Sequence, residues 1–134
     1  MTTGSPERTP LRHGALEGLR VLELAQGIAG PYCGRIFADH GATVVKVEPR
    51  GTGDTTRSWG PFPGDRRDFE KSGTFFFLNT DKRSVALDVD AADDRQRLLD
   101  LLRETDVLID DSSPRQLQER GLDYATLARL NPKL

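Results

Sequence analysis

Glycines follow a short apolar run near the start of the chain, in a spacing that suits contact with an anionic ligand. From Gly27 to Gly34 the spacing is G-x-x-G-x-x-x-G, which differs from the G-x-G-x-x-G of dinucleotide-binding turns. Pro31 stands where a helix would begin, and free N–H groups at a helix start can accept an anion. Glu48 stands where an NAD site would have its ribose-binding acid. The pattern leaves three interpretations open: a purely structural turn, an anion-binding helix start, or an NAD site.

Cationic side chains give a second candidate for phosphate binding. Charged residues gather at the end of the second apolar run, namely Lys46, Glu48, Arg50 and Arg57. They form either a solvated rim or a phosphate-binding group, in which Arg would supply forked hydrogen bonds. The alternation in "VVKVE" predicts that the Lys46 side chain leaves the core face. Lys82 and Arg83 allow the same two readings, a turn with edge charges or a basic patch beside a nucleotide.

Residues for nucleophilic or metal chemistry are scarce. His13, His40 and Cys33 are the only histidines and cysteine in the chain, so neither a Ser-His-Asp set nor a zinc spacing can be built. We expect Cys33 to be a small buried hydrophobic residue on the first helix. A lone cysteine rules out a disulfide framework and fits a reducing cytoplasm.

Length and charge limit the class of protein. At 134 residues the chain suits one domain or a piece of one. Charged residues make up 30% but leave a net charge of only −2, which argues against a nucleic-acid-binding surface. No apolar run approaches the roughly 20 residues of a membrane span. Residues 1–15 are rich in Pro, Gly, Ser, Thr and Arg and are predicted to be a disordered tail.

Strand-like and helix-like segments alternate from residue 16 onward. Short β-branched or apolar runs predict strands at 19–25, 42–48, 84–89 and 106–110. Helices are expected from Pro31 to Gly41 and at 91–104, 114–120 and 123–130, and Tyr32, Ile36, Phe37 and His40 share one helical face. Residues 49–73 form a long loop, followed by an apolar cluster at 75–78. This order predicts an α/β domain with a mostly parallel sheet. Ligands bind such sheets at the carboxyl ends of their strands, here loops 26–31, 48–58 and 110–116.

One long stretch, "LEGLRVLELAQGIAGPYCGRIFADHGATVVKVEPRGTGDTTR", resembles the N-terminal segment of the family III CoA-transferases. That group includes formyl-CoA and carnitine CoA-transferases and the related α-methylacyl-CoA racemases. The resemblance continues through "NTDKRSVALDV", "ETDVLID" and "RGLDYATLARLNPKL", and so covers residues 16–134. The order of "AGP", "GATVVKVEP", "GD-x-x-R" and "NTDKRS-x-x-LD" makes it specific.

The resemblance implies an incomplete, N-terminal part of a Rossmann-like domain that binds coenzyme A. The glycine turn would then be a CoA cradle and not a dinucleotide one. Positions matching the family's CoA contacts are Ile28, Ala29, Pro49, Arg50, Leu87, Asp88, Val89, Asp90, Asp111, Ser112 and Ser113, and those at 87–90 would line the adenine. The resemblance also implies an acyl-CoA and a carboxylic acid as substrates, a homodimeric parent enzyme and no metal.

Two departures from the family pattern follow the fourth expected strand. Family members commonly have "ENF-x-PG" there, whereas this chain has "DDSSPR". The position of an Arg that grips a CoA phosphate is taken by Glu119, and a carboxylate repels a phosphate. Arg115 or Arg120 would have to replace that cation.

The family's catalytic aspartate belongs to a segment that would lie beyond Leu134. In the transferases this aspartate takes the acyl group as a mixed anhydride, which divides one difficult transfer into two easier steps. We therefore expect no catalytic residue in this chain. The alternatives are a racemase-type enzyme with its bases downstream, and a degenerate, non-catalytic half of a tandem transferase kept for assembly.

Overall fold

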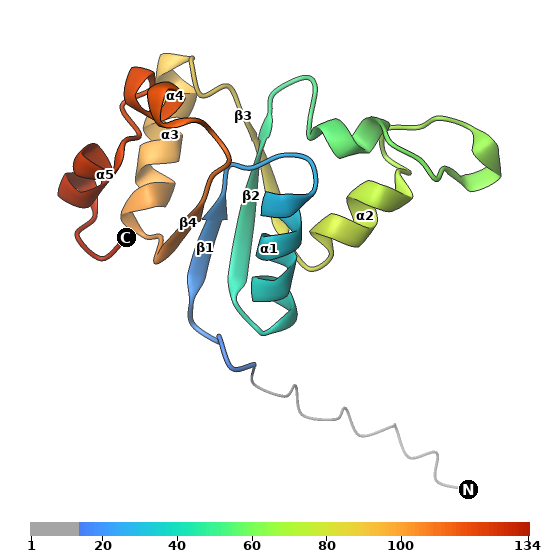
Figure 1. Cartoon of the computed structure of the whole chain (residues 1–134), viewed down its shortest axis with the longest axis horizontal. Coiled ribbons are helices and arrows are strands. Elements are labelled where there is room, and N and C mark those ends of the chain that lie inside the picture. The colour runs from blue at the N-terminus through green and yellow to red at the C-terminus, as the bar shows by residue number, and fades with distance from the viewer. Residues whose placement is uncertain (1–13) are drawn as a thin grey trace, which may run out of the picture.

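A four-stranded parallel sheet organises the molecule in our computed structural model, which describes residues 14–134 (Figure 1). Its strands are β1 (Arg20–Glu23), β2 (Thr43–Pro49), β3 (Arg83–Leu87) and β4 (Val107–Ile109), in the order β3-β2-β1-β4. Every neighbouring pair is parallel. The predicted α/β class is confirmed, and the predicted strands are correct to within two residues at each end. The expected tail falls mainly on residues 1–13, which lie outside the described residues.

Within residues 14–134, five α-helices connect or follow the strands, and the long segment after β2 contains two short 3-10 helices, Thr55–Ser58 and Pro63–Asp65. The α-helices are α1 (Ala29–Asp39), α2 (Gly73–Asn79), α3 (Ala92–Arg103), α4 (Pro114–Glu119) and α5 (Tyr124–Leu130). Two predictions need correction. The first helix begins at Ala29, two residues before Pro31. The apolar cluster at 75–78 is part of α2, because the Ser72 hydroxyl accepts a hydrogen bond from the Phe75 amide at 3.0 Å and caps a helix start.

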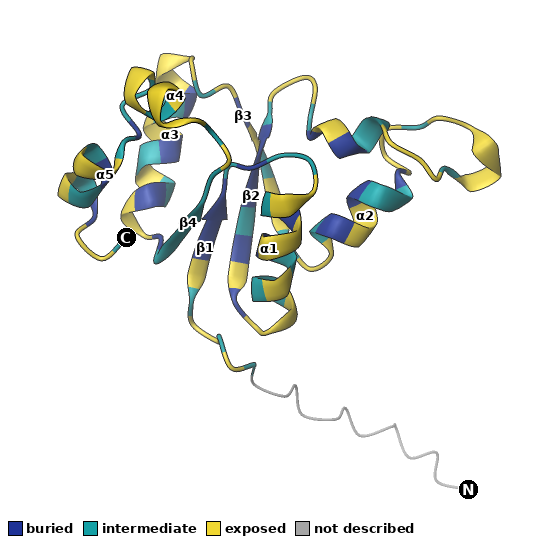
Figure 2. Cartoon of the chain, in the orientation of Figure 1, coloured by how far each residue is buried: buried dark blue, intermediate teal, exposed yellow. Residues whose placement is uncertain are grey.

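The two faces of the sheet bury different side chains (Figures 1 and 2). One face forms the larger apolar core with α3 and α5, made of Leu22, Val47, Leu87, Leu98, Leu102, Leu122 and Leu127. On the other face α1 packs over a smaller cluster of Val21, Ala42 and Val44. Along this second face the strands also carry Glu23, Lys46 and Glu48, all of them buried. The face under α1 is therefore apolar at one end and charged at the other.

Glycine lets α1 approach this charged face closely. A Cβ atom at Gly34 would lie 2.0 Å from Oε2 of Glu23, and one at Gly30 would lie 2.1 Å from the Cβ of Ala25. Both distances are far below van der Waals contact, so no larger residue fits without movement of the helix. These two glycines of the G-x-x-G-x-x-x-G pattern therefore serve helix-to-strand packing.

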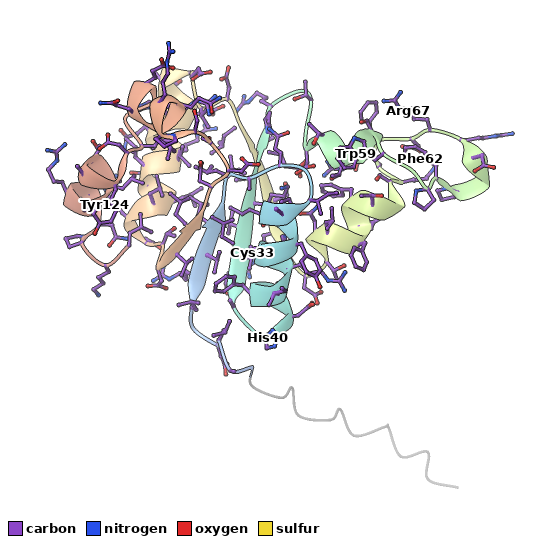
Figure 3. All side chains as sticks on the ribbon, in the orientation of Figure 1. Cys33, His40, Trp59, Phe62, Arg67 and Tyr124 are labelled. Atoms are coloured by element: carbon purple, nitrogen blue, oxygen red, sulfur yellow. The ribbon has the colours of Figure 1, made fainter. Side chains whose placement is uncertain are left out.

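The outer side of α1 differs from the prediction. Tyr32 and Ile36 are 48% and 44% exposed, and Cys33 is exposed as well (Figure 3). Of the predicted apolar face, Phe37 packs against the cluster of Val21, Ala42 and Val44, whereas Tyr32 and Ile36 lie on its exposed side. Cys33 is not a buried hydrophobic residue. Tyr32 stacks on Phe77 of α2, with ring centroids 6.5 Å apart, so this side chain joins the two helices.

A buried ion pair anchors the long segment between β2 and α2. Arg57 donates to both carboxylate oxygens of Glu48, at 2.6 and 2.9 Å, and the Asp54 amide donates to the same group at 2.9 Å. Burial raises the pKa of the Glu48 carboxyl, but the hydrogen bonds from Arg57, Ser84 and the Asp54 amide outweigh it and lower that pKa to about 2. The loop that follows β2 is thus fixed by a charged group at the strand's own end.

The Gly34→Ala variant should destabilise the protein by roughly 1–3 kcal/mol, the usual cost of overpacking. The loss is expected although alanine is the better helix former, because the new Cβ would collide with the Glu23 carboxylate. Chemical denaturation measures the free energy of unfolding. Cys33→Ala, one position away on the exposed side of α1, is the matched control and should leave that free energy nearly unchanged. Equal stability of the two variants would contradict the close packing.

The Glu48 pair should make stability depend on acid pH. Because the folded-state pKa of Glu48 is depressed from 4.5 to about 2, its contribution is present above pH 4.5 and is lost as the pH falls toward 2. The difference in unfolding free energy between wild type and Glu48→Gln should therefore shrink across this range. Urea titrations at several pH values measure it. Glu104→Gln, which removes an exposed carboxylate, should show no such trend, and a constant difference for Glu48→Gln would refute the argument.

Candidate functional site

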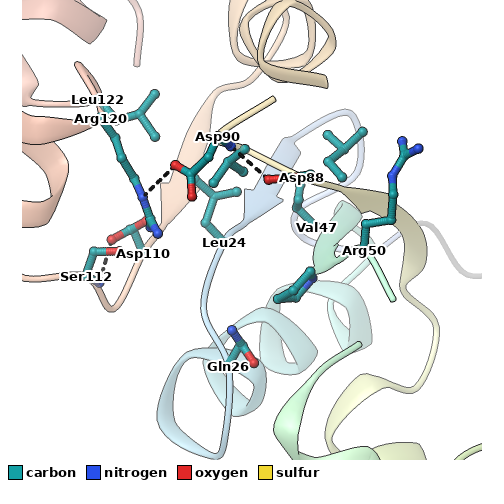
Figure 4. A pocket seen from close by; sticks show the side chains of 13 residues that line it. Leu24, Gln26, Val47, Arg50, Asp88, Asp90, Asp110, Ser112, Arg120 and Leu122 are labelled. Atoms are coloured by element: carbon teal, nitrogen blue, oxygen red, sulfur yellow. Dashed lines mark hydrogen bonds and ion pairs between the residues drawn. The ribbon is translucent and has the colours of Figure 1, made fainter. Parts of the chain in front are cut away.

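A cavity of about 310 Å³ opens at the carboxyl ends of the four strands (Figure 4). Ligand pockets in proteins commonly measure roughly 300–1,000 Å³, so this one lies at the small end of that range. Parallel sheets bind ligands at this edge, where the strand order reverses direction. Here the reversal lies between β1 and β4, because β1 leads through α1 to β2 on one side while β4 pairs with its other side.

Many of the residues predicted to contact a ligand meet in this cavity. Those that line it are Pro49, Arg50, Leu87, Asp88, Val89, Asp90 and Ser112. Arg120, one of the two arginines considered as a replacement cation, also lines it. The structure adds residues that the sequence did not single out for binding: Leu24, Gln26, Val47, Asp110 and Leu122. The predicted loops after β1, β2 and β4 do converge, as their positions at strand ends required. The apolar additions look like ordinary core residues in the sequence, and only their place at the ends of strands could have marked them.

The floor of the cavity is apolar. Leu24, Val47, Leu87, Val89 and Leu122 contribute to it from the ends of β1, β2 and β3 and from the turn before α5. Three of them, Val47, Leu87 and Leu122, also belong to the buried core. A rigid floor of this kind suits a flat apolar group, such as an aromatic ring, better than a hydrated charge.

Charged side chains surround the rim. Arg50 lies 2.6 Å from Asp94 of α3 but remains 55% exposed, so part of its guanidinium is free to bind another anion. Arg120 lies 3.8 Å from Asp90 across the opening. Asp88 and Asp110 line the same cavity. The rim thus offers two cations and several carboxylates to a ligand.

Other predicted contact residues have structural roles. Asp111 accepts a hydrogen bond from the Gln26 amide at 3.0 Å, which joins the turn after β1 to the loop after β4. The Ser113 hydroxyl caps α4 by accepting from the Gln116 amide at 3.3 Å. Glu119, at the position of the family's phosphate-binding arginine, accepts from Arg115 at 2.8 Å. Of the two arginines considered as its replacement, Arg120 lines the cavity and Arg115 pairs with Glu119.

The start of α1 does not line this cavity. Ile28 lies in a separate apolar hollow with Phe77 and Leu78 of α2, and no cavity that we describe is lined by Ala29. Gln26, just before the glycines, is the residue of this turn that reaches the main cavity. Glu48, the candidate ribose-binding acid, is fully engaged by Arg57, Ser84 and the Asp54 amide, which speaks against an NAD site.

Two lysines considered for phosphate binding are buried with carboxylates. Lys46 is only 1% exposed; its ammonium lies 2.7 Å from Glu23 Oε1 and 2.7 Å from Asp54 Oδ2. The Lys82 ammonium lies 2.7 Å from Glu23 Oε2. Burial lowers the pKa of Lys82, an effect that the hydrogen bond to Glu23 opposes. Lys46 does leave the apolar core face as predicted, but α1 covers the other face. Neither lysine is free to meet a phosphate, and Lys82 is not an edge charge.

Residues 14–134 contain neither a metal-binding cluster nor a membrane-spanning helix. Among the described side chains, no group of three or more His, Cys, Asp or Glu residues is arranged to hold a metal ion. Over the same range, none of the helices combines the length and apolar character that crossing a membrane requires.

Comparison with characterised proteins identifies relatives that share almost the whole chain. A succinyl-CoA:mesaconate CoA-transferase of Haloarcula hispanica is 42% identical over 90% of the chain and 30% of its own length. A succinate–glutarate CoA-transferase of Agrobacterium fabrum is 40% identical over 98% of the chain and 32% of its own length. The chain thus spans about a third of the length of such relatives.

Solved structures and the family's sequence pattern agree with this result. A CAIB/BAIF family protein from Brucella suis superposes with a TM-score of 0.81 at 37% identity, over 92% of this chain and 32% of that one. The sequence model of CoA-transferase family III matches residues 16–134. The fold, the relatives and the family pattern converge, and the chain belongs to CoA-transferase family III.

Proposed function

We propose that this chain forms part of the coenzyme A pocket of an acyl-CoA:carboxylate CoA-transferase. The observation that carries the proposal is the cavity at the strand ends, because residues assigned to CoA contact by the family resemblance meet there. Membership of the family and relatives that are CoA-transferases support the same conclusion.

The chemistry of the cavity suits the nucleotide end of CoA. An adenine ring would lie on the apolar floor between Leu24, Val89 and Leu122. Arg50 and Arg120 at the rim would meet phosphate oxygens, for which guanidinium groups offer paired hydrogen bonds. Arg120 would then replace the cation that Glu119 does not supply. The small volume fits only part of so long a cofactor, so the rest would extend over the rim.

The chemical step belongs, in this proposal, to residues outside the 134-residue chain. In the transferase reaction an aspartate attacks the acyl-CoA carbonyl and releases the CoA thiolate, which leaves the acyl group on the enzyme as a mixed anhydride. The thiolate attacks the aspartyl carbonyl of this anhydride and expels the donor as a free carboxylate, which leaves CoA on the aspartate as a thioester. The acceptor carboxylate attacks that thioester and releases the thiolate, which then attacks the acceptor's carbonyl in the new anhydride and frees the aspartate. None of the described carboxylates at the cavity stands out as that nucleophile. We propose that the chain alone is inactive, and that the complete enzyme is a cytoplasmic homodimer that uses an acyl-CoA and a carboxylic acid.

A second candidate is a non-catalytic half retained for assembly. The observation that favours it is the number of carboxylates at the rim, where Asp88, Asp90 and Asp110 line the cavity and Glu119 occupies the family's cation position. Like charges near a phosphate reduce affinity. Binding of CoA distinguishes the two candidates.

Isothermal titration calorimetry with CoA should show micromolar binding to the wild-type protein. Arg120→Gln and Arg50→Gln should each weaken it about 10- to 100-fold, because a hydrogen bond to a charged group contributes about 1.5–3 kcal/mol. Arg115→Gln is the matched control: its side chain is exposed and paired with Glu119 away from the cavity, and the affinity should not change.

Each result decides between the candidates. No heat of binding with CoA would overturn the proposal in favour of the assembly role. Binding that is insensitive to both cavity arginines would show that CoA is held elsewhere. NAD is the comparison ligand. Equal affinity for NAD and CoA would mean that the cavity binds only the adenine nucleotide that the two ligands share.

A further inference from the structure

A single buried carboxylate joins two lysines beneath the start of α1. Oε1 of Glu23 accepts from Lys46 Nζ at 2.7 Å, and Oε2 accepts from Lys82 Nζ at 2.7 Å. The three side chains are at most 1% exposed. They come from β1, from β2 and from the turn before β3, so one charged group ties together segments far apart in sequence.

Both lysines also bind main-chain oxygens, at the two ends of the turn that connects β1 to α1. Lys46 donates to the carbonyl oxygen of Ala25 at 2.8 Å. Lys82 donates to the carbonyl oxygen of Pro31 at 2.6 Å and to the side chain of Asn79 at 2.9 Å. Residues 26–30 thus lie between two carbonyl groups that are held by ammonium groups bridged through Glu23.

The segment between these carbonyls includes the start of α1, where the Tyr32 amide donates to the Ile28 carbonyl oxygen at 2.8 Å. Gly27 has a φ of +73°, a conformation that glycine adopts without strain. The Gln26 amide bonds to Asp111 and the Gln26 side chain accepts from the Thr55 amide at 3.3 Å, so its contacts are to other loops. The two lysines hold the carbonyl groups on either side of this segment from the buried face, and Gln26 within it lines the cavity.

We propose that Lys46 and Lys82 are positioning residues that clamp the turn 26–30 and so fix the cavity wall at Gln26. They act through the carbonyl groups of Ala25 and Pro31 and do not touch the ligand. The clamp itself is independent of the ligand, whereas its effect on binding rests on the proposed function.

The charges of the cluster suggest how to test the clamp without unfolding the protein. Lys46 and Lys82 face two carboxylates, Glu23 and Asp54. Loss of one partner alone would leave a buried charge unpaired, which is strongly destabilising. The double variant Glu23→Gln with Lys82→Met removes one charge of each sign and keeps the Lys46–Asp54 pair. It also removes the hydrogen bond to Pro31.

The measurement is ¹⁵N relaxation at the amides of Gly27, Ile28 and Ala29, together with CoA affinity by calorimetry. In the wild type the order parameters should be close to the roughly 0.85 of rigid backbone, and in the double variant they should fall below about 0.6. The CoA affinity should fall at least 10-fold. Asp68→Asn with Lys71→Met, which removes an exposed pair at 2.9 Å, is the matched control and should change neither quantity.

The two readouts separate the possible failures. A folded double variant whose turn stays rigid would overturn the clamp, as would a wild-type turn that is already flexible. A looser turn with unchanged CoA affinity would keep the clamp and refute its role in binding. If the wild type binds no CoA, the proposed function fails and the relaxation data still decide the clamp.

If the double variant does not fold, Asn79→Ala provides a milder test. This variant removes one partner of the Lys82 ammonium and should lower the order parameters of the same amides by a smaller amount. Unchanged order parameters in this variant would also overturn the clamp.

Discussion

The buried Glu23 carboxylate is the constraint on which the rest of the structure depends. An unpaired charge cannot remain in a protein interior, so Glu23 requires Lys46 beside it and Lys82 from the turn before β3. These pairs link β1 to β2 and to the turn before β3 on the charged side of the sheet. They also explain Gly34, since a helix can pass over this carboxylate only where it has no side chain.

One face of the sheet mainly stabilises the fold, and the other mainly orients the loops of the candidate site. The face covered by α3 and α5 is apolar and contributes the main hydrophobic stabilisation. The face covered by α1 carries buried charges whose hydrogen bonds have preferred directions, and these orient the turn after β1 and the loop after β2. The buried apolar side chains and the buried charged side chains both reach the carboxyl ends of the strands, where the cavity lies.

The chain matches only part of the length of its transferase relatives. The chain covers 30–32% of the length of the two transferases compared above, and its cavity has an apolar floor with a mixed rim of arginines and aspartates. Such a rim can select for an anionic ligand only if the arginines outweigh the carboxylates at the point of contact. Arg120 and Asp90, 3.8 Å apart at the opening, are the pair in which this balance can be tested.

Periodicity and residue type in the sequence were enough to predict the α/β order, the parallel strands and the loops that converge on the site, because these follow from local patterns and from the geometry of β-α-β units. The motifs supplied the family. Burial, however, is a property of the whole fold. Lys46 and Lys82 were predicted to be surface charges and are interior, while Cys33 was predicted to be buried and is exposed. Only the tertiary structure could decide these positions, because a charge is stable in the interior only when distant segments bring its partners to it.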